Sequence, residues 1–219
     1  MKIKVCGMKF PDNINELKKL PIDYMGLILY PKSVRYFFGE DKDISVEAKK
    51  EALFEIPSHI KKVGVFVNDD PMHISFCIKH MKLDAIQLHG SESELDCDLM
   101  RDLHPNTELI KAFNVSVASD FDQAKDYEGL VDFFLFDTKT PQHGGSGQKF
   151  DWSILDAYKG NTPFFLSGGI SADDAEAIKR IKHPLFYGID LNSKFETAPG
   201  LKNIQLLQQF IKTLKDEQN

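Results

Sequence analysis

The stretch from Thr162 to Asp190, "TPFFLSGGISADDAEAIKRIKHPLFYGID", contains the repeating unit from which the fold of this chain can be inferred. An apolar run opens it, two glycines follow, and a segment with helical spacing leads to a second apolar run. A strand, a helix and another strand joined by short connections are typical of parallel strands covered by helices. This unit therefore predicts an α/β architecture with a parallel sheet.

The same alternation extends over all 219 residues. Eight apolar runs are IKVC (3–6), YMGLILY (24–30), KKVGVFV (61–67), DAIQLH (84–89), ELIKAF (108–113), DFFLFD (132–137), TPFFLS (162–167) and PLFYGID (184–190). Eight such units in a chain of this length indicate a closed (β/α)8 TIM barrel, and we expect residues 1–219 to form a single domain. The rival is an open doubly wound sheet, but the first run is followed by "CGMKF", which lacks the glycine spacing of a dinucleotide site.

Helix starts are predicted where a capping side chain precedes an amphipathic segment. The candidate caps are Asp12, Asp70, Ser91, Ser116 and Ser171. The last helix is expected in "NIQLLQQFIKTLK", residues 203–215.

The composition limits the classes of function. Hydrophobic residues make up 42% of the chain and charged residues 27%, and no apolar run reaches the ~18 residues of a spanning helix, so we expect no membrane association. The net charge of −6 without a basic cluster argues against nucleic acid as a partner. Cys6, Cys77 and Cys97 form no CxxC pair, which argues against a zinc site or a disulfide framework. With no signal-like N-terminal segment, a cytoplasmic location is expected.

Polar residues gather where the predicted strands end, which is the end that carries the active site in such barrels. Cys6 follows the first run, Gln87 and His89 lie at the end of the fourth, and Asp190 ends the eighth. Asp137 ends the sixth run and opens a loop with three glycines, of which Gly145 is one. We expect these side chains to line one site.

A phosphate site is predicted after the last two strands. Gly168 and Gly169 stand between a strand and a helix start, where exposed backbone amides and the helix dipole can hold an anion. Asn192 and Ser193 add amide and hydroxyl donors from the next loop. The alternative is that the glycine pair only forms a tight turn.

Seven ordered motifs resemble those of the phosphoribosylanthranilate isomerase family. They are "KVCGMK", "MGLILYPKSVRYF", "VGVFVN", "IQLHGSE", "FDTKTPQHGGSGQKFDW", "LSGGIS" and "YGIDLNSKFETAPGLKN", and they cover the chain from Lys2 to about Asn203. Each motif is weak alone, but their order over nearly the whole chain is specific. The resemblance implies a TIM barrel of tryptophan biosynthesis that isomerises a phosphorylated sugar adduct, with neither metal nor organic cofactor.

By this resemblance Cys6 is the general base and Asp137 the general acid of an Amadori rearrangement. Arg35 binds the anthranilate carboxylate of the substrate, and the glycine loops bind its phosphate. Residues 141–148, "PQHGGSGQ", are expected to cover the bound substrate. The resemblance leaves open whether the chain is a monomer or a homodimer.

The chain departs from the family pattern at two loops. Val34 precedes Arg35 where proline is common, and Asn192, Ser193 and Lys194 replace a Ser-Ser-Gly pattern. Lysine at position 194 cannot take, without strain, the positive φ that glycine accepts, so the geometry of this phosphate loop is left open. The alternatives are another phosphosugar enzyme with a barrel fold or a silent barrel that binds a phosphorylated metabolite or a protein.

Overall fold

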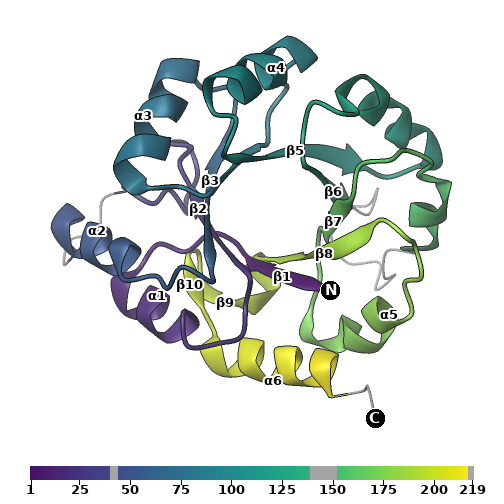
Figure 1. The fold of residues 1–219 in the computed structure, drawn as a ribbon. Coiled ribbons are helices and arrows are strands. Elements are labelled where there is room, and N and C mark those ends of the chain that lie inside the picture. Colours follow the sequence, from purple (N-terminus) through teal and green to yellow (C-terminus); the bar gives the residue numbers. More distant parts are fainter. Residues whose placement is uncertain (40–43, 139–151, 217–219) are drawn as a thin grey trace.

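The computed structural model describes residues 1–39, 44–138 and 152–216, and these form a closed barrel of eight parallel strands surrounded by helices (Figure 1). The strands are β1 (Lys2–Val5), β2 (Tyr24–Ile28), β3 (Lys61–Phe66), β4 (Ala85–Leu88), β5 (Glu108–Val115), β6 (Phe133–Thr138), β7 (Phe164–Ser167) and β8 (Phe186–Leu191). Each strand pairs with the next in sequence, and β1 pairs with β8 in the register Lys4 opposite Asp190. The TIM-barrel prediction is confirmed, and all eight runs form strands.

The connections on the outside of the barrel are less regular than the strands. The α-helices are α1 (Pro11–Leu17), α2 (Val46–Phe54), α3 (Pro71–Met81), α4 (Glu94–Leu103), α5 (Ala175–Lys179) and α6 (Ile204–Lys215). Short 3-10 helices are η1 (Ala118–Tyr127), η2 (Trp152–Ala157), η3 (Ala172–Asp174) and η4 (Ser193–Phe195). A small antiparallel hairpin, β9 (Glu196–Ala198) and β10 (Leu201–Lys202), follows η4 and was not predicted.

Two of the five predicted caps are in place. Asp70 accepts hydrogen bonds from the backbone N–H groups of Met72 and His73 at the start of α3, and Ser171 is the residue before η3. The other three predictions are wrong, since α1 begins after Phe10, α4 begins after Ser93, and η1 begins after Val117. At α4 the capping box of Ser93 and Asp96 satisfies the first backbone N–H groups, which leaves Ser91 outside the helix.

The barrel interior changes from apolar to polar along its axis. Inward-facing side chains in the lower part form an apolar cluster of Tyr24, Val63, Ala85, Ile110, Ala112, Phe133, Leu135 and Phe165. The rings of Tyr24 and Phe165 meet edge to face with centroids 5.3 Å apart. Because strand side chains alternate between faces, Gln87 and Asp137, two residues after Ala85 and Leu135, also face inward. The apolar packing closes the amino-terminal end and leaves the polar groups at the carboxyl end.

In the described part of the chain, none of the helices is long and apolar enough to cross a membrane.

Candidate functional site

Cys6 lies at the mouth of the barrel, directly after β1. Its side chain is 4% exposed, and its backbone N–H donates to the carbonyl of Leu191 at 2.9 Å. Gly26 on β2 leaves room for the thiol, since a Cβ built at position 26 would lie 2.6 Å from Cys6 Sγ. The neighbouring strand therefore fixes the thiol in position and excludes any larger residue beside it.

A buried ion pair lies next to Cys6 inside the barrel. Lys4 Nζ donates to Asp190 Oδ1 at 2.9 Å, and the two side chains are 0% and 5% exposed. Burial alone lowers the pKa of Lys4, but Asp190 and Cys6 raise it, and the balance leaves that pKa above its usual value. Lys4 is therefore charged. Asp190 was predicted at the site from the sequence, but Lys4 was not.

The pKa of the Cys6 thiol is set by four competing influences. Burial raises it, Lys4 lowers it, Asp190 raises it and Lys202 lowers it, and the outcome is a raised pKa. The lysines therefore counteract only part of the burial effect, and in the free protein the thiol form of Cys6 predominates at neutral pH.

A second charged cluster joins the β2 loop to the β9–β10 hairpin. Arg35 donates from Nε and Nη2 to the Glu196 carboxylate, the shorter contact being 2.6 Å, and Lys202 Nζ donates to the same carboxylate at 2.6 Å. Lys202 also donates to Asn192 Oδ1 at 2.8 Å. A Cβ at Gly7 would lie 2.8 Å from Asn192 Oδ1 and 3.0 Å from Arg35 Cδ, so both residues approach the backbone next to Cys6.

Two members of this cluster, Glu196 and Lys202, were not predicted. Burial raises the pKa of Glu196, but the hydrogen bonds from Arg35 and Lys202 outweigh it and the net shift is downward. Burial lowers the pKa of Lys202 more than Glu196 raises it. Both lie within the motif "YGIDLNSKFETAPGLKN", but the resemblance assigned them no role, and they belong to a hairpin whose strands are only three and two residues long.

Asp137 occupies the opposite part of the mouth, on β6. His89 Nε2 lies 3.8 Å from Asp137 Oδ2, and His89 Nδ1 is 2.6 Å from Gln87 Nε2. Gln87 is buried, and among the described residues its Oε1 atom has no hydrogen-bond partner. The predicted residues Gln87, His89 and Asp137 therefore lie together, while β7 and β8 separate β6 from β1 along the barrel.

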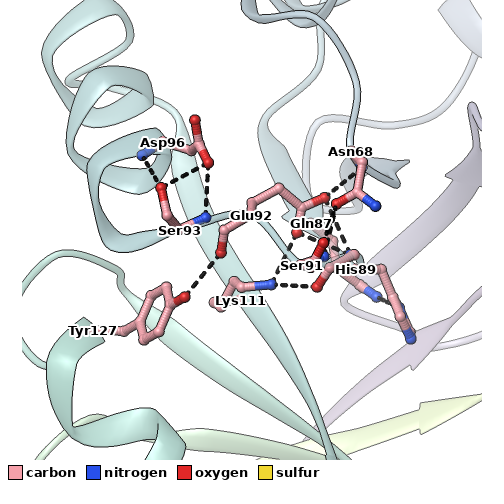
Figure 2. A network of polar contacts seen from close by, with 10 residues as sticks. Asn68, Gln87, His89, Ser91, Glu92, Ser93, Asp96, Lys111 and Tyr127 are labelled. Atoms are coloured by element: carbon pink, nitrogen blue, oxygen red, sulfur yellow. Dashed lines mark hydrogen bonds and ion pairs between the residues drawn. The ribbon is translucent and has the colours of Figure 1, made fainter.

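The loop after β4 is held from below by another buried ion pair (Figure 2). Lys111 Nζ, on β5, donates to Glu92 Oε2 at 2.9 Å and to the carbonyl of Gly90 at 2.8 Å. Glu92 Oε1 accepts from the backbone N–H of Asn68 at 2.7 Å, and Oε2 accepts from that of Gly90 at 2.9 Å. These contacts tie the loop that carries His89 to the neighbouring strands.

The glycines after β7 have two distinct roles. A Cβ at Gly168 (φ +99°) would lie 2.0 Å from the Thr138 carbonyl oxygen, so the loop passes directly against the β6 backbone. Gly169 has φ +67° and open space around its Cα. Gly168 therefore allows the tight turn against β6, and Gly169 lies in an accessible part of the same loop. Asn192 precedes η4 and Ser193 begins it, while Gly145 lies outside the described residues.

One cavity of about 330 Å³ lies away from these residues, around the ends of β3 and β4. It is lined by Asn68, Asp69, Pro71, Ile74, Leu88, Ser91, Glu92, Asp96 and Met100. None of the residues predicted for the site contributes to this lining. We place the candidate site at the barrel mouth, where the inward-facing thiol, carboxylates and imidazole are found.

Comparison with known proteins identifies the family. The model of the N-(5'-phosphoribosyl)anthranilate (PRA) isomerase family matches residues 3–213. This chain belongs to the PRA isomerase family. The relative from Parabacteroides distasonis, named N-(5'-phosphoribosyl)anthranilate isomerase, is 46% identical over 98% of this chain and 93% of its own. The relative from Phocaeicola vulgatus, with the same name, is 41% identical over 99% of both chains.

Solved structures of the PRA isomerase family have the same fold. The enzyme from Thermotoga maritima is 32% identical with a TM-score of 0.80, and the match covers 98% of both chains. A second family structure, in complex with reduced 1-(o-carboxyphenylamino)-1-deoxyribulose 5-phosphate, is 29% identical with a TM-score of 0.79 over 98% of both chains.

One departure from the PRA isomerase pattern has a structural answer. In the described chain the non-glycine residues with positive φ are Asn68 and Lys82, so Lys194 takes an ordinary backbone conformation. The loop after β8 therefore folds without the glycine that the family pattern has there. Asn203 caps α6 by accepting from the Leu206 N–H at 3.0 Å.

Proposed function

We propose that this chain catalyses the Amadori rearrangement of N-(5-phosphoribosyl)anthranilate to 1-(2-carboxyphenylamino)-1-deoxyribulose 5-phosphate, with Cys6 as general base and Asp137 as general acid. It is an aldose-ketose isomerase of tryptophan biosynthesis. Membership of the PRA isomerase family over residues 3–213 carries this conclusion. The location of Cys6 after β1 and of Asp137 on β6 supports the assignment of roles, because both strands end at one barrel mouth with β7 and β8 between them.

The reaction needs one proton donor and one proton acceptor on opposite sides of a pentose. The carboxylic acid of Asp137 protonates the furanose ring oxygen, and the ring opens to a Schiff base. The Cys6 thiolate removes the proton from C2′ to give an enolamine, which tautomerises to the ketone. Each group supplies about 10²- to 10⁴-fold in rate when the reacting carbon is held between them.

The remaining predicted residues are assigned to substrate binding. Arg35 binds the anthranilate carboxylate with the part of its guanidinium that Glu196 leaves open, since the contacts to Glu196 use only Nε and Nη2. The phosphate is assigned to the amides of the loops after β7 and β8. The substrate-binding set is Arg35, Gln87, His89, Gly145, Gly168, Gly169, Asp190, Asn192 and Ser193.

The assembly and the location of the chain belong to the same proposal. One solved structure is of generated monomers of the dimeric phosphoribosylanthranilate isomerase from Thermotoga maritima, and it is 30% identical with a TM-score of 0.77. Light scattering of the purified chain distinguishes a monomer from a homodimer. A cytoplasmic location follows from the metabolic role, and a single domain over residues 1–219 stays a prediction.

Two substitutions test the assigned roles. Cys6→Ser and Asp137→Asn each remove one proton-transfer group with little change in shape, and we expect turnover to fall at least about 10²-fold. Binding of the reduced product analogue should change little, because neither residue is assigned to binding. Turnover is followed by the fluorescence of the anthranilate adduct. Near-normal turnover in either variant shows that the role is wrongly assigned.

Growth tests the activity itself. The chain should restore growth without tryptophan to an auxotroph that lacks this isomerase, and Asp137→Asn should not. If the folded wild-type chain neither rescues growth nor consumes the adduct, the proposed reaction is wrong.

Arg35→Ala tests the substrate contact. We expect KM to rise with a smaller change in kcat, since Arg35 holds a part of the substrate that does not react. Glu196 loses a partner in the same variant, so Arg35→Lys is measured beside it to retain the charge. An unchanged KM in Arg35→Ala removes Arg35 from the binding site.

A further inference from the structure

We propose that Lys4, held by Asp190, is a positioning residue that makes Cys6 a usable base by stabilising its thiolate from inside the barrel. This inference rests on the proposed function only in taking Cys6 as the base. It adds a residue with a defined physical role, since burial opposes ionisation of the Cys6 thiol and a nearby positive charge favours it.

The geometry places the ammonium group below the thiol. Lys4 and Cys6 are two positions apart along the chain, so both side chains face the barrel interior, and their Cα atoms are about 7 Å apart along β1. Asp190 is opposite Lys4 in the pairing of β1 with β8, and its hydrogen bond of 2.9 Å fixes the lysine. In the described part of the chain, Lys4 is the only hydrogen-bond partner given for the Asp190 carboxylate.

The charged groups that face Cys6 come from four elements. Lys4 on β1 and Lys202 on β10 favour the thiolate, Asp190 on β8 opposes it, and Arg35 in the loop after β2 interacts with it electrostatically. Lys202 and Arg35 are held by Glu196 in the hairpin cluster, as Lys4 is held by Asp190, but only Lys4 lies on β1, two positions before Cys6. Lys4 therefore makes the larger contribution to the thiolate.

The thiol releases its proton to solvent before the substrate covers the mouth, and Lys4 stays protonated throughout. Lys4 neither accepts nor donates the catalytic proton, so it acts only through the charge that it places beside Cys6.

The experiment measures the ionisation of Cys6 without substrate. The rate of alkylation by iodoacetamide is followed from about pH 6 to 11, with mass spectrometry resolving the peptide that carries Cys6. Cys77 and Cys97 in the same sample report on global unfolding, since both thiols are packed in the apolar core of the folded barrel. In Lys4→Met the Cys6 midpoint should rise by about one pH unit or more, because a nearby opposite charge is lost.

The opposite substitution should give the opposite sign. Asp190→Asn removes an anion from beside the thiolate and should lower the midpoint, whereas Lys4→Arg keeps the charge and should stay near wild type. Lys111→Met is the matched control, because Lys111 forms an equally buried pair with Glu92, also at 2.9 Å, that has no contact with Cys6. It should leave the Cys6 midpoint unchanged.

If Lys4→Met does not fold, Lys4→Met/Asp190→Asn takes its place, and its midpoint should still rise because the effect of Lys4 exceeds that of Asp190. The proposal is overturned by an unchanged or lowered midpoint in the folded lysine variant, or by the same shift in Lys111→Met. Alkylation needs no turnover, so loss of the proposed isomerase reaction is a separate result.

Discussion

Two lysine–carboxylate pairs are buried in this barrel, and they differ in what surrounds them. Lys4–Asp190 lies inside the barrel beside Cys6, and Lys111–Glu92 lies on the outer side of β5 beneath the loop that carries His89. Both pairs have an N–O distance of 2.9 Å, and both are almost fully buried. The same chemistry therefore occurs in two settings of one fold.

The partners of the carboxylates separate the two roles. Glu92 accepts backbone hydrogen bonds from Asn68 and Gly90 in addition to Lys111, so it fastens two loops (Figure 2). Among the described residues, Lys4 is the only hydrogen-bond partner given for the Asp190 carboxylate. The charges of both residues act on the Cys6 thiol. We conclude that the outer pair stabilises loop structure and the inner pair sets an electrostatic environment.

The largest effect is expected on stability when the outer pair loses its lysine. Lys111→Met leaves Glu92 buried and unpaired, which should lower the free energy of unfolding by about 3–5 kcal/mol in urea denaturation. The control is Lys18→Met, whose partner Glu55 is 2.9 Å away but exposed; it should cost less than about 1 kcal/mol. Equal losses in both variants contradict the role of burial.

Replacing both members of each pair by apolar residues sharpens the comparison. The free energy of unfolding of Lys4→Met/Asp190→Leu should lie within about 1 kcal/mol of the wild-type value, because two buried charges are removed together. Lys111→Met/Glu92→Met should remain at least about 1 kcal/mol less stable, because the Asn68 and Gly90 N–H groups lose their acceptor. The same urea experiment measures both. Equal stability of the two double variants contradicts the distinction drawn between the pairs.

A smaller and more local effect is expected at Gly26. The Cβ of Gly26→Ala would lie 2.6 Å from Cys6 Sγ and 3.0 Å from Cys6 Cα, so it should displace the thiol and lower turnover about tenfold or more. The matched control is Gly64→Ala, whose Cβ would lie 2.6 Å from Leu83 Cδ1 in the outer core. Both variants should lose stability. Only Gly26→Ala should reduce turnover and change the rate of Cys6 alkylation. Normal values of both in Gly26→Ala contradict the dependence of the reaction on the position of the Cys6 thiol.

Much of the fold was predictable because its signals are local. The eight apolar runs and the segments between them identified every barrel strand, and the rule that active sites lie at the carboxyl ends of strands selected Cys6, Gln87, His89 and Asp137. The helix starts were less predictable. Ser93 and Asp96 form a capping box whose spacing is visible in the sequence, but Ser91, two residues earlier, is an equally good capping residue type by itself.

The sequence by itself determined the strand order, the barrel and the family, since all of these depend on periodicity and on ordered motifs. Only the tertiary structure decided the charged surroundings of the site. Lys4 meets Asp190 across 186 positions because the closing of the barrel places β8 beside β1, and Lys202 reaches Asn192 and Glu196 only through a short hairpin. Contacts of this kind depend on where strands end in space, and no local pattern of residues encodes that position.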